Sequence, residues 1–474
     1  MNKPTFHTFS NDVLGKRDAV ALQEMLWAGK ISSVELTQAA LKRLEKAQAL
    51  TSAVLICGDE ALKHAKDWDA KRKTYASHRG FGGIPSLLKD NMDLAGFPTR
   101  HGSRATPSQP VKKSSALVGQ FHQIGLHFLG KTKLPEFGFT ATTEFTQGEP
   151  ARNPWNLDHS TGGSSGGSAA LVAAGVVPIA HANDGGGSIR IPASACGLVG
   201  LKPSRGRLVP NEMAKSLPVK IVSDGVVTRS VRDTAMFYAE AEKVFKNPKL
   251  PAIGLVNSPL NKRLRIGFFT DKATGGKVHP DCVAGVLQTA QLLESLGHHV
   301  EEIPLPVNEQ FAEDFLMYWA FMAASVKYTG KLLFGRAWNS SQMEPFSQHL
   351  ADHLTRRIHR LPMTLRRLKQ FEGEYSKFFK QYDILLSATL GTPPPVIGHL
   401  ALDLPFPIAQ ERLFDFACYT AAQNVSGAPA ISLPLHFSNG LPVGIHFASA
   451  TGQEKLLLEL ALQLEESTNN FTPT

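Results

Sequence analysis

Two glycine- and serine-rich segments lie close together in the sequence and contain residues that could perform acyl transfer. The first, STGGSSGGSAA at 160–170, contains Ser164, and the second, HANDGGGSIRIPASACG at 181–197, contains Ser188. Three glycines precede Ser188, and successive N–H groups without side chains can curl around one point, as an oxyanion hole must around a developing alkoxide. A tight turn that needs positive φ angles is the alternative. Because the chain has two such loops, we favour a catalytic role over a simple turn, with Ser188 as the candidate nucleophile.

The first segment allows three other interpretations. A flexible linker is disfavoured because the segment runs directly into SAALVAAG, which predicts a helix of small residues. An anion-binding loop would suit the glycines, but the Gly-Lys-Ser/Thr ending of a Walker loop is absent. Gly162–Gly166 also fits the Gly-x-Ser-x-Gly elbow of α/β-hydrolases, with Ser164 as nucleophile. That elbow must follow a strand directly, whereas the preceding EPARNPWNLDHS predicts a turn-rich loop.

A serine nucleophile needs a base, and the sequence offers histidines and a lysine. His159 and His181 lie near the loops, but neither has an orienting carboxylate at close spacing, so we interpret both as structural or surface residues. Lys89 follows an apolar run and precedes a polar turn, which is typical of a strand end. Burial would lower its pKa from about 10.4 toward neutrality and make it a base. Taken alone, it is one of 50 basic residues, and only its context favours a role.

Short apolar runs separated by helical patterns predict the elements that must position these residues. Buried strands are predicted at 126–130, 176–182, 264–269, 383–389, 429–435 and 442–448. Helices are predicted at 31–48, 281–297 and 454–467, the first with a capping box formed by Ser32 and Glu35. Strands that alternate with helices indicate an α/β protein whose central sheet is mixed, mostly parallel and covered by helices on both faces.

The composition of the 474-residue chain, 42% hydrophobic and 19% charged, is typical of a globular protein with a substantial core. No stretch approaches the roughly 18 apolar residues of a membrane span, and the polar N-terminus has no secretory signal. The cysteines have neither metal-binding nor paired spacing, which predicts a cytoplasmic protein without a disulfide framework or a zinc site. They are Cys57, Cys196, Cys282 and Cys418.

The net charge of +9 raises the question of an acidic partner. Part of the excess lies in LTRRIHRLPMTLRRLKQF at 354–371, which could bind a membrane or nucleic acid. No nucleic-acid motif accompanies it, so we interpret it as an ordinary amphipathic helix with a solvated basic face, broken near Pro362. The aromatic-rich region 305–380 is helical by pattern and predicts either core or the apolar wall of a small-molecule pocket.

Several segments together resemble the amidase signature family. The likeness covers nearly the whole chain and is most specific from 82 to 235. The variants DGGGSIR and LKPSRGR look most like the branch that contains 6-aminohexanoate cyclic dimer hydrolases. The matching segments are GIPSLLKDNMDLAG (83–96), GKTKLPEFG (130–138), STGGSSGGSAALVAAG (160–175), NDGGGSIRIPASACGLVGLKPSRGR (183–207), TRSVRDTA (228–235) and the C-terminal residues 424–465.

The resemblance implies a Ser-Ser-Lys mechanism that needs no cofactor or metal. Ser188 would be the acylated nucleophile, Ser164 the bridging serine after a cis peptide bond from Gly163, and Lys89 the base. The implied supporting residues are Gly185, Gly186, Gly187 and Ser188 as N–H donors of the oxyanion hole, Ser165, Asp184 and Arg190 as braces, and Phe137 and Gly138 within a pocket-lining stretch at 135–139. Two positions depart from the family pattern without removing a catalytic group. Asn183-Asp184-Gly185 replaces a more usual Asp-Thr or Asp-Ile, and Ala388 stands where many members carry proline.

The resemblance also implies one amidase-signature domain over residues 1–474. We expect a catalytic core at about 60–240, a variable helical region that faces the substrate at about 305–400, and a C-terminal part of the core at about 401–467.

We therefore predict a hydrolase that cleaves C–N bonds of linear or cyclic amides, and by the same acyl transfer carbamates or esters. Its reactants would be a small-molecule amide and water, with no nucleic acid and with a homodimer left open. An amidotransferase subunit that delivers ammonia to a partner is the alternative, weakly favoured by the basic charge and disfavoured by DGGGSIR. A non-catalytic binding protein is disfavoured because Lys89, Ser164 and Ser188 occur together.

Overall fold

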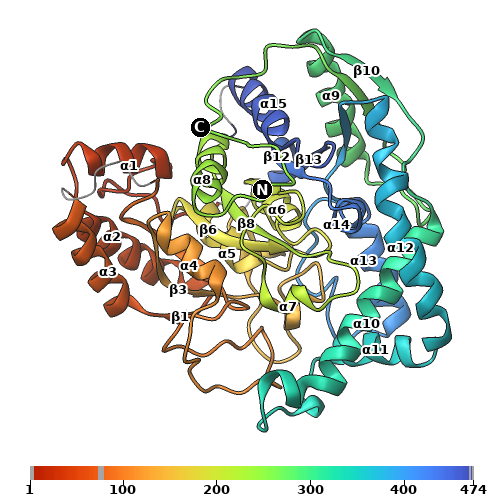
Figure 1. Cartoon of the computed structure of the whole chain (residues 1–474), viewed down its shortest axis with the longest axis horizontal. Coiled ribbons are helices and arrows are strands. Elements are labelled where there is room, and N and C mark those ends of the chain that lie inside the picture. Colours follow the sequence, from red (N-terminus) through yellow and green to blue (C-terminus); the bar gives the residue numbers. More distant parts are fainter. Residues whose placement is uncertain (1–4, 73–79, 469–470, 472–474) are drawn as a thin grey trace.

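A sheet of eight strands forms the centre of the fold in the computed structural model, which describes residues 5–72, 80–468 and 471 (Figure 1). The strand order is β10-β9-β11-β13-β12-β7-β8-β6. The strands are β6 Ile179–Asp184, β7 Val199–Lys202, β8 Ser223–Thr228, β9 Arg265–Phe268, β10 His299–Glu302, β11 Ile384–Ala388, β12 Ala430–Ser438 and β13 Leu441–Ala448. Five of the predicted strands lie here, within a few residues of their expected bounds, and the sixth lies in a smaller sheet.

The large sheet is mixed, as predicted, but the expectation that it is mostly parallel is wrong. Only β10–β9 and β9–β11 pair in parallel, and the other neighbours pair antiparallel. The strand–helix–strand pattern yields a parallel pair where α9 (Pro280–Ser295) links β9 to β10. Strands β12 and β13 instead form a hairpin. Its turn residues Asn439 and Gly440 have φ angles of 49° and 81°, and Asn-Gly is a strong hairpin signal.

A smaller sheet brings Lys89 to the end of the large one. It consists of β1 (Ala53–Ile56), β3 (Leu126–Thr132) and β2 (Ile84–Lys89) in the order β1-β3-β2. Its β2 lies against β6 of the large sheet, where Ser86 Oγ donates to the Ile179 carbonyl at 2.9 Å. The last residue of β2 therefore lies beside the last residues of β6, which open the second glycine-rich loop. A third, two-stranded sheet contains β4 (Arg152–Asn153) and β5 (Asn156–Ser160).

Helices cover both faces of the large sheet, as predicted. Successive side chains of a strand point to opposite faces. On β13, Gly444 has no side chain and so approaches α6 (Arg190–Cys196) closely, and its N–H donates to Ser194 Oγ at 2.8 Å. The next residue, Ile445, contacts α9 near Gly285 on the other face. Helix α6, which begins just after Ser188, is thus fixed between the sheet and the candidate site.

The remaining helices flank this core. Helix α2 carries the predicted capping box: Glu35 N–H donates to Ser32 Oγ at 3.1 Å, and Ser32 N–H donates to the Glu35 carboxylate at 2.8 Å. Besides α6 and α9, these helices are α1 Ala19–Trp27, α2 Ser33–Lys46, α3 Gly58–Lys71, α4 Ala116–Gln123, α5 Gly166–Ala173, α7 Glu212–Lys215, α8 Val231–Val244, α14 Ala421–Ser426 and α15 Glu454–Ser467.

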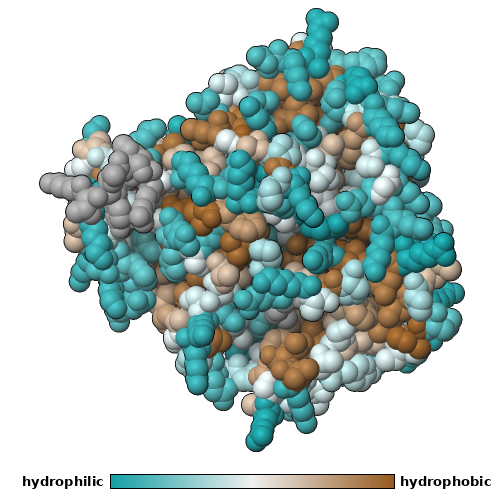
Figure 2. Space-filling model, viewed as in Figure 1, coloured by the Kyte–Doolittle hydropathy of each residue, from teal (hydrophilic) through white to brown (hydrophobic). Residues whose placement is uncertain are grey.

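Four further helices form a group at the right of Figure 1: α10 Glu309–Phe334, α11 Pro345–Thr355, α12 Leu361–Ser376 and α13 Phe406–Phe416. Helix α12 begins near Pro362, as the break in the basic segment predicted. It buries Thr364, Leu368 and Phe371 and exposes Arg366. Figure 2 shows hydrophilic side chains along the edge where α12 lies. The basic segment is thus not one helix: it spans the end of α11, a 3-10 helix at Ile358–Arg360 and α12. Arg356, Arg360 and Arg366 are exposed, whereas Arg367 donates to the buried Asp314 carboxylate.

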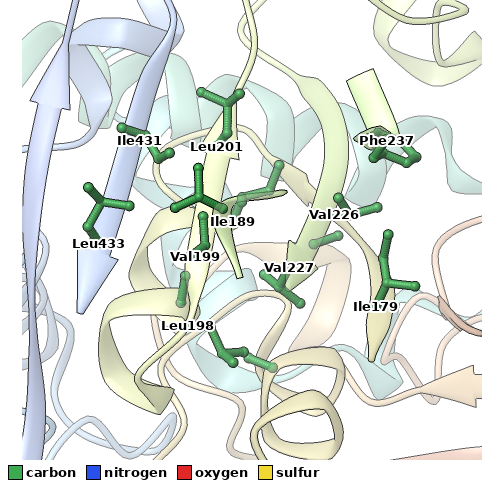
Figure 3. Packing of buried hydrophobic residues seen from close by; sticks show 14 of the residues in the cluster. Ile179, Ile189, Leu198, Val199, Leu201, Val226, Val227, Phe237, Ile431 and Leu433 are labelled. Atoms are coloured by element: carbon green, nitrogen blue, oxygen red, sulfur yellow. The ribbon is translucent and has the colours of Figure 1, made fainter. Parts of the chain in front are cut away.

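Aliphatic side chains from several strands pack into one core beside the site. Figure 3 shows Val199 and Leu201 of β7, Val226 and Val227 of β8, and Ile431 and Leu433 of β12 in this cluster. Burial of each such side chain stabilises the folded state by roughly 1.5–3 kcal/mol. The strands next to the glycine-rich loops are therefore held firmly in place. Within the described part of the chain, no helix combines the length and apolar character needed to cross a bilayer. The division of the domain into a core and a substrate-facing region stays a prediction.

Candidate active site

Lys89, at the end of β2, is fully buried and donates to three neutral oxygen atoms. Its Nζ lies 2.7 Å from Ser164 Oγ, 2.9 Å from Ser165 Oγ and 2.6 Å from Asn183 Oδ1. An ammonium group has three N–H donors, so these contacts satisfy it completely. The first glycine-rich loop supplies two of the acceptors and the end of β6 supplies the third. These residues are up to 94 positions apart in the sequence.

Burial lowers the pKa of Lys89 to about 7, although the charges of Asp224 and Asp184 act in the opposite direction. None of the three atoms that accept from Nζ is a carboxylate oxygen, so no ion pair holds the proton on the amine. A lysine with such a pKa exchanges protons near neutral pH, which is where a general base works best. Its hydrogen bond to Ser164 makes that hydroxyl the first partner in any proton transfer.

The first glycine-rich loop is anchored at both ends. The Gly163–Ser164 peptide bond is cis. Gly162 N–H donates to Ser160 Oγ at 3.1 Å, and Ser165 immediately precedes α5. The linker interpretation therefore does not hold. The residues before the loop, expected to be a turn-rich loop, instead include β5, which ends at Ser160. Because β5 belongs to the two-stranded sheet and not to the central one, the strand that an α/β-hydrolase elbow requires is still missing.

The stretch at 135–139 closes over Ser164. Glu136–Gly138 form a short 3-10 helix, and Gly138 has a φ of 72°. A Cβ atom on Gly138 would lie 2.9 Å from Ser164 Oγ, so a larger residue would press on that hydroxyl. Phe137 and Gly138 both line the cavity that contains Ser164.

The second glycine-rich loop is braced by the buried Asp184 carboxylate. It accepts from the N–H groups of Gly187 at 2.7 Å and Ile189 at 3.2 Å. Gly187 has a φ of 129°, and a Cβ there would lie 2.2 Å from Thr420 Oγ1, so only glycine fits. The Gly187 N–H, expected to help form an oxyanion hole, is thus already engaged within the loop. Gly185, Gly186 and Ser188 supply the remaining expected donors.

Arg190 holds Asp184 in place through two parallel hydrogen bonds. Its Nε and one terminal nitrogen donate to the carboxylate oxygens at 2.9 and 3.0 Å. The guanidinium also donates to the Thr420 carbonyl at 2.8 Å and to Asn424 Oδ1 at 2.7 Å. Burial alone would raise the pKa of Asp184, but the charge and hydrogen bonds of Arg190 lower it below its ordinary value. The pair therefore stays ionised and fixes the loop that carries Ser188.

We expect Arg190→Met to destabilise the protein by about 3–5 kcal/mol, because it leaves the Asp184 carboxylate buried and uncompensated. Thermal unfolding would show the loss as a lower midpoint. The matched control is Arg366→Met, which removes an exposed arginine from α12 and should leave the midpoint nearly unchanged. Equal midpoints for the two variants would contradict the bracing role of Arg190.

Ser188 shares a cavity with two of the residues that accept from Lys89. Ser164, Asn183, Gly185 and Ser188 all line it, and Ser188 is 6% exposed. In the described residues, the Ser188 hydroxyl makes no hydrogen bond to another protein group, so its contact with Ser164 would have to form when substrate binds. Catalytic hydrogen bonds often tighten in this way on substrate binding.

The two histidines near the loops lie on strands β6 and β5. His181 is fully buried in β6, where its ring accepts from the Lys89 backbone N–H at 3.3 Å and lies 3.4 Å from an oxygen of Asp224. His159 lies on β5 and pairs with Val396. The interpretation of both as structural or surface residues agrees with these positions, although Asp224 gives His181 a neighbouring carboxylate that the sequence spacing did not show.

A family model described as amidase matches residues 35–458. The chain belongs to the amidase family. Putative amidase AmiC of Mycobacterium tuberculosis is 43% identical over 463 residues, which cover 97% of this amidase and 96% of that protein. The 6-aminohexanoate-cyclic-dimer hydrolase of Paenarthrobacter ureafaciens is 33% identical, covering 95% and 94% of the two chains. The solved structure of a 6-aminohexanoate cyclic dimer hydrolase with its substrate superposes with a TM-score of 0.84 at 30% identity, covering 96% and 97%.

These comparisons confirm the resemblance found in the sequence: the amidase is a hydrolase of amides with the amidase-signature fold. The structure adds one residue to the candidate site of this amidase. Asn183 was noted in the sequence only as a departure from the family pattern, yet its side chain accepts directly from Lys89. Its position directly before Asp184 was the one feature of the sequence that could have suggested a role in the site. The sequence does not show which group Asn183 meets, and only the packing of β2 against β6 reveals Lys89 as its partner.

Proposed function

We propose that this amidase cleaves C–N bonds of small linear or cyclic amides through an acyl-enzyme on Ser188, and that carbamates and esters undergo the same transfer. One contact carries the proposal: Lys89, whose pKa burial lowers to about 7, donates to Ser164 Oγ. Ser164 and Ser188 line the same cavity. The name of the 6-aminohexanoate-cyclic-dimer hydrolase relatives makes cyclic amides the first class to test.

In the proposed acylation step, Ser188 Oγ attacks the carbonyl carbon while its proton passes to Ser164 and the Ser164 proton passes to neutral Lys89. The N–H groups of Gly185, Gly186 and Ser188 would stabilise the oxyanion. When the C–N bond breaks, the proton returns from Lys89 through Ser164 to the leaving amine. Water then attacks the acyl group, and the same relay accepts its proton and returns one to Ser188.

The test is a panel of a simple anilide, a cyclic amide, a carbamate and an ester, each incubated with the purified chain alone. We expect hydrolysis of at least the anilide and the cyclic amide, with an amine and a carboxylic acid as products. If no free amide were turned over unless a partner protein was added, the amidotransferase alternative would replace this proposal.

Asn183→Asp is expected to move the pH dependence of catalysis to higher pH. A carboxylate 2.6 Å from Lys89 Nζ would stabilise the ammonium form and raise the pKa of Lys89 by about 1–3 units. Because the neutral amine is the base, kcat/KM rises with pH through this pKa, near pH 7 in the parent enzyme. The variant should therefore be weakly active at neutral pH and recover in alkaline buffer. A pH profile that coincides with that of the parent would show that Asn183 does not govern Lys89, and Asn183→Gln, which adds no charge, is the control.

A further inference from the structure

Two cavities meet at Ser188 and differ in what lines them. We call the first the relay chamber, because Ser164 and Asn183 line it. We call the second the apolar chamber; its wall includes Ile191, Phe311, Phe315, Leu350, Leu413 and Phe414. Among the described residues, no charged side chain lines the apolar chamber. Four residues border both chambers: Gly138, Phe139, Ser188 and Trp319.

One face of α10 forms a wall of both chambers. Ala312, Phe315 and Leu316 border the apolar chamber, and Met322, Ser325 and Thr329 border the relay chamber. These positions follow the three- and four-residue spacing of a single helical face. Trp319 lies midway between the two sets, and its indole Nε1 donates to the Phe139 carbonyl at 3.0 Å. The junction beside Ser188 is therefore held by a tethered aromatic ring.

The position of the relay decides which part of the substrate enters which chamber. A leaving amine needs a proton from a donor within hydrogen-bond reach. The relay residues Ser164 and Asn183 border only the relay chamber. The amine must therefore lie in the relay chamber. With the carbonyl carbon at Ser188, the acyl substituent extends to the other side, into the apolar chamber.

We propose that the apolar chamber is the acyl-binding site and that this amidase prefers amides of uncharged aliphatic or aromatic carboxylic acids longer than acetate. This inference rests on the proposed function. Each methylene transferred from water into such a chamber strengthens binding up to about fourfold. A charged acyl group would lose its hydration there without a compensating partner. Ala312 lies at the outer end, where the chamber meets a surface hollow lined by Glu313, His349 and Arg356.

The experiment measures kcat/KM for 4-nitroanilides that share one amine and differ in the acyl group: acetyl, butyryl, hexanoyl, octanoyl and the charged succinyl. We expect kcat/KM to rise from acetyl to hexanoyl by at least about tenfold and to fall for succinyl. A flat series, or one that peaks at acetyl or succinyl, would overturn the inference. If no anilide were hydrolysed, or if Ser188→Ala hydrolysed them equally, the proposed function itself would fail.

Two matched variants on α10 locate the effect. Ala312→Phe fills the outer end of the apolar chamber and should lower the octanoyl-to-acetyl ratio of kcat/KM at least about tenfold. Ser325→Phe fills the relay chamber and should keep that ratio near the parent value. It should instead lower the ratio of a bulky anilide to a methylamide of the same acid. The reverse pattern would mean that acyl and amine groups occupy the opposite chambers, and would refute the assignment. Both residues are half-buried on one helix, and unfolding midpoints will show whether each variant folds.

Discussion

Ser188→Ala is expected to lower kcat/KM for a simple anilide by about 10⁴-fold or more, because it removes the atom that forms the acyl-enzyme. The side chain loses one oxygen atom and leaves its loop intact, since Asp184 and Arg190 hold that loop through the backbone and through each other. The unfolding midpoint should therefore stay close to that of the parent. Steady-state rates and thermal unfolding of the two proteins check both statements.

Covalent labelling distinguishes Ser188 from Ser164 as the nucleophile. A fluorophosphonate should modify the peptide that contains Ser188 in the parent enzyme and leave Ser188→Ala unlabelled. Ser164→Ala should still carry the label on Ser188, formed more slowly because the relay is broken. Label on the Ser164 peptide, or residual turnover of Ser188→Ala within tenfold of the parent, would refute Ser188 as nucleophile.

Lys89→Met is expected to lower kcat/KM for the anilide by about 10²–10⁴-fold, the usual contribution of a general acid–base residue. Methionine is similar in length and suits a buried site, but it can neither take the proton from Ser164 nor return it to the amine. The rise of activity through pH 7 that we expect for the parent should disappear, because Lys89 has a pKa of about 7. The loss of kcat/KM should be smaller for esters than for anilides. An alkoxide is a better leaving group than the nitrogen anion that departs when the amine receives no proton.

Lys202→Met is the matched control for this prediction. Lys202 is also fully buried, and burial together with the charge of Arg190 lowers its pKa to about 7. Its Nζ donates to the Pro203 carbonyl and not to a serine of the site. The control should therefore keep the pH dependence of the parent. If Lys202→Met lost that dependence and Lys89→Met kept it, the base would have been assigned to the wrong lysine.

Local patterns in the sequence determined much of the fold. Apolar runs located five strands of the large sheet but not β7, β8 or β10, and the capping box at Ser32 and Glu35 located the start of α2. Both signals depend on neighbours within a few residues. Strand direction was predicted less well. The Asn439-Gly440 hairpin turn was an overlooked local signal, while the other antiparallel pairs depend on how distant segments return to the sheet.

The sequence by itself also determined the candidate chemistry: the serines, the lysine and the glycines are recognisable from their types, spacing and family likeness. Only the tertiary structure decided which of them meet. Packing of β2 against β6 places Lys89 beside Asn183, a contact that no local pattern encodes. The fold also engages the Gly187 N–H with Asp184 and lays one face of α10 across two chambers. Contacts between residues far apart in the chain arise from the packing of whole elements, so burial, pKa and the division of substrate space appear only once the chain has folded.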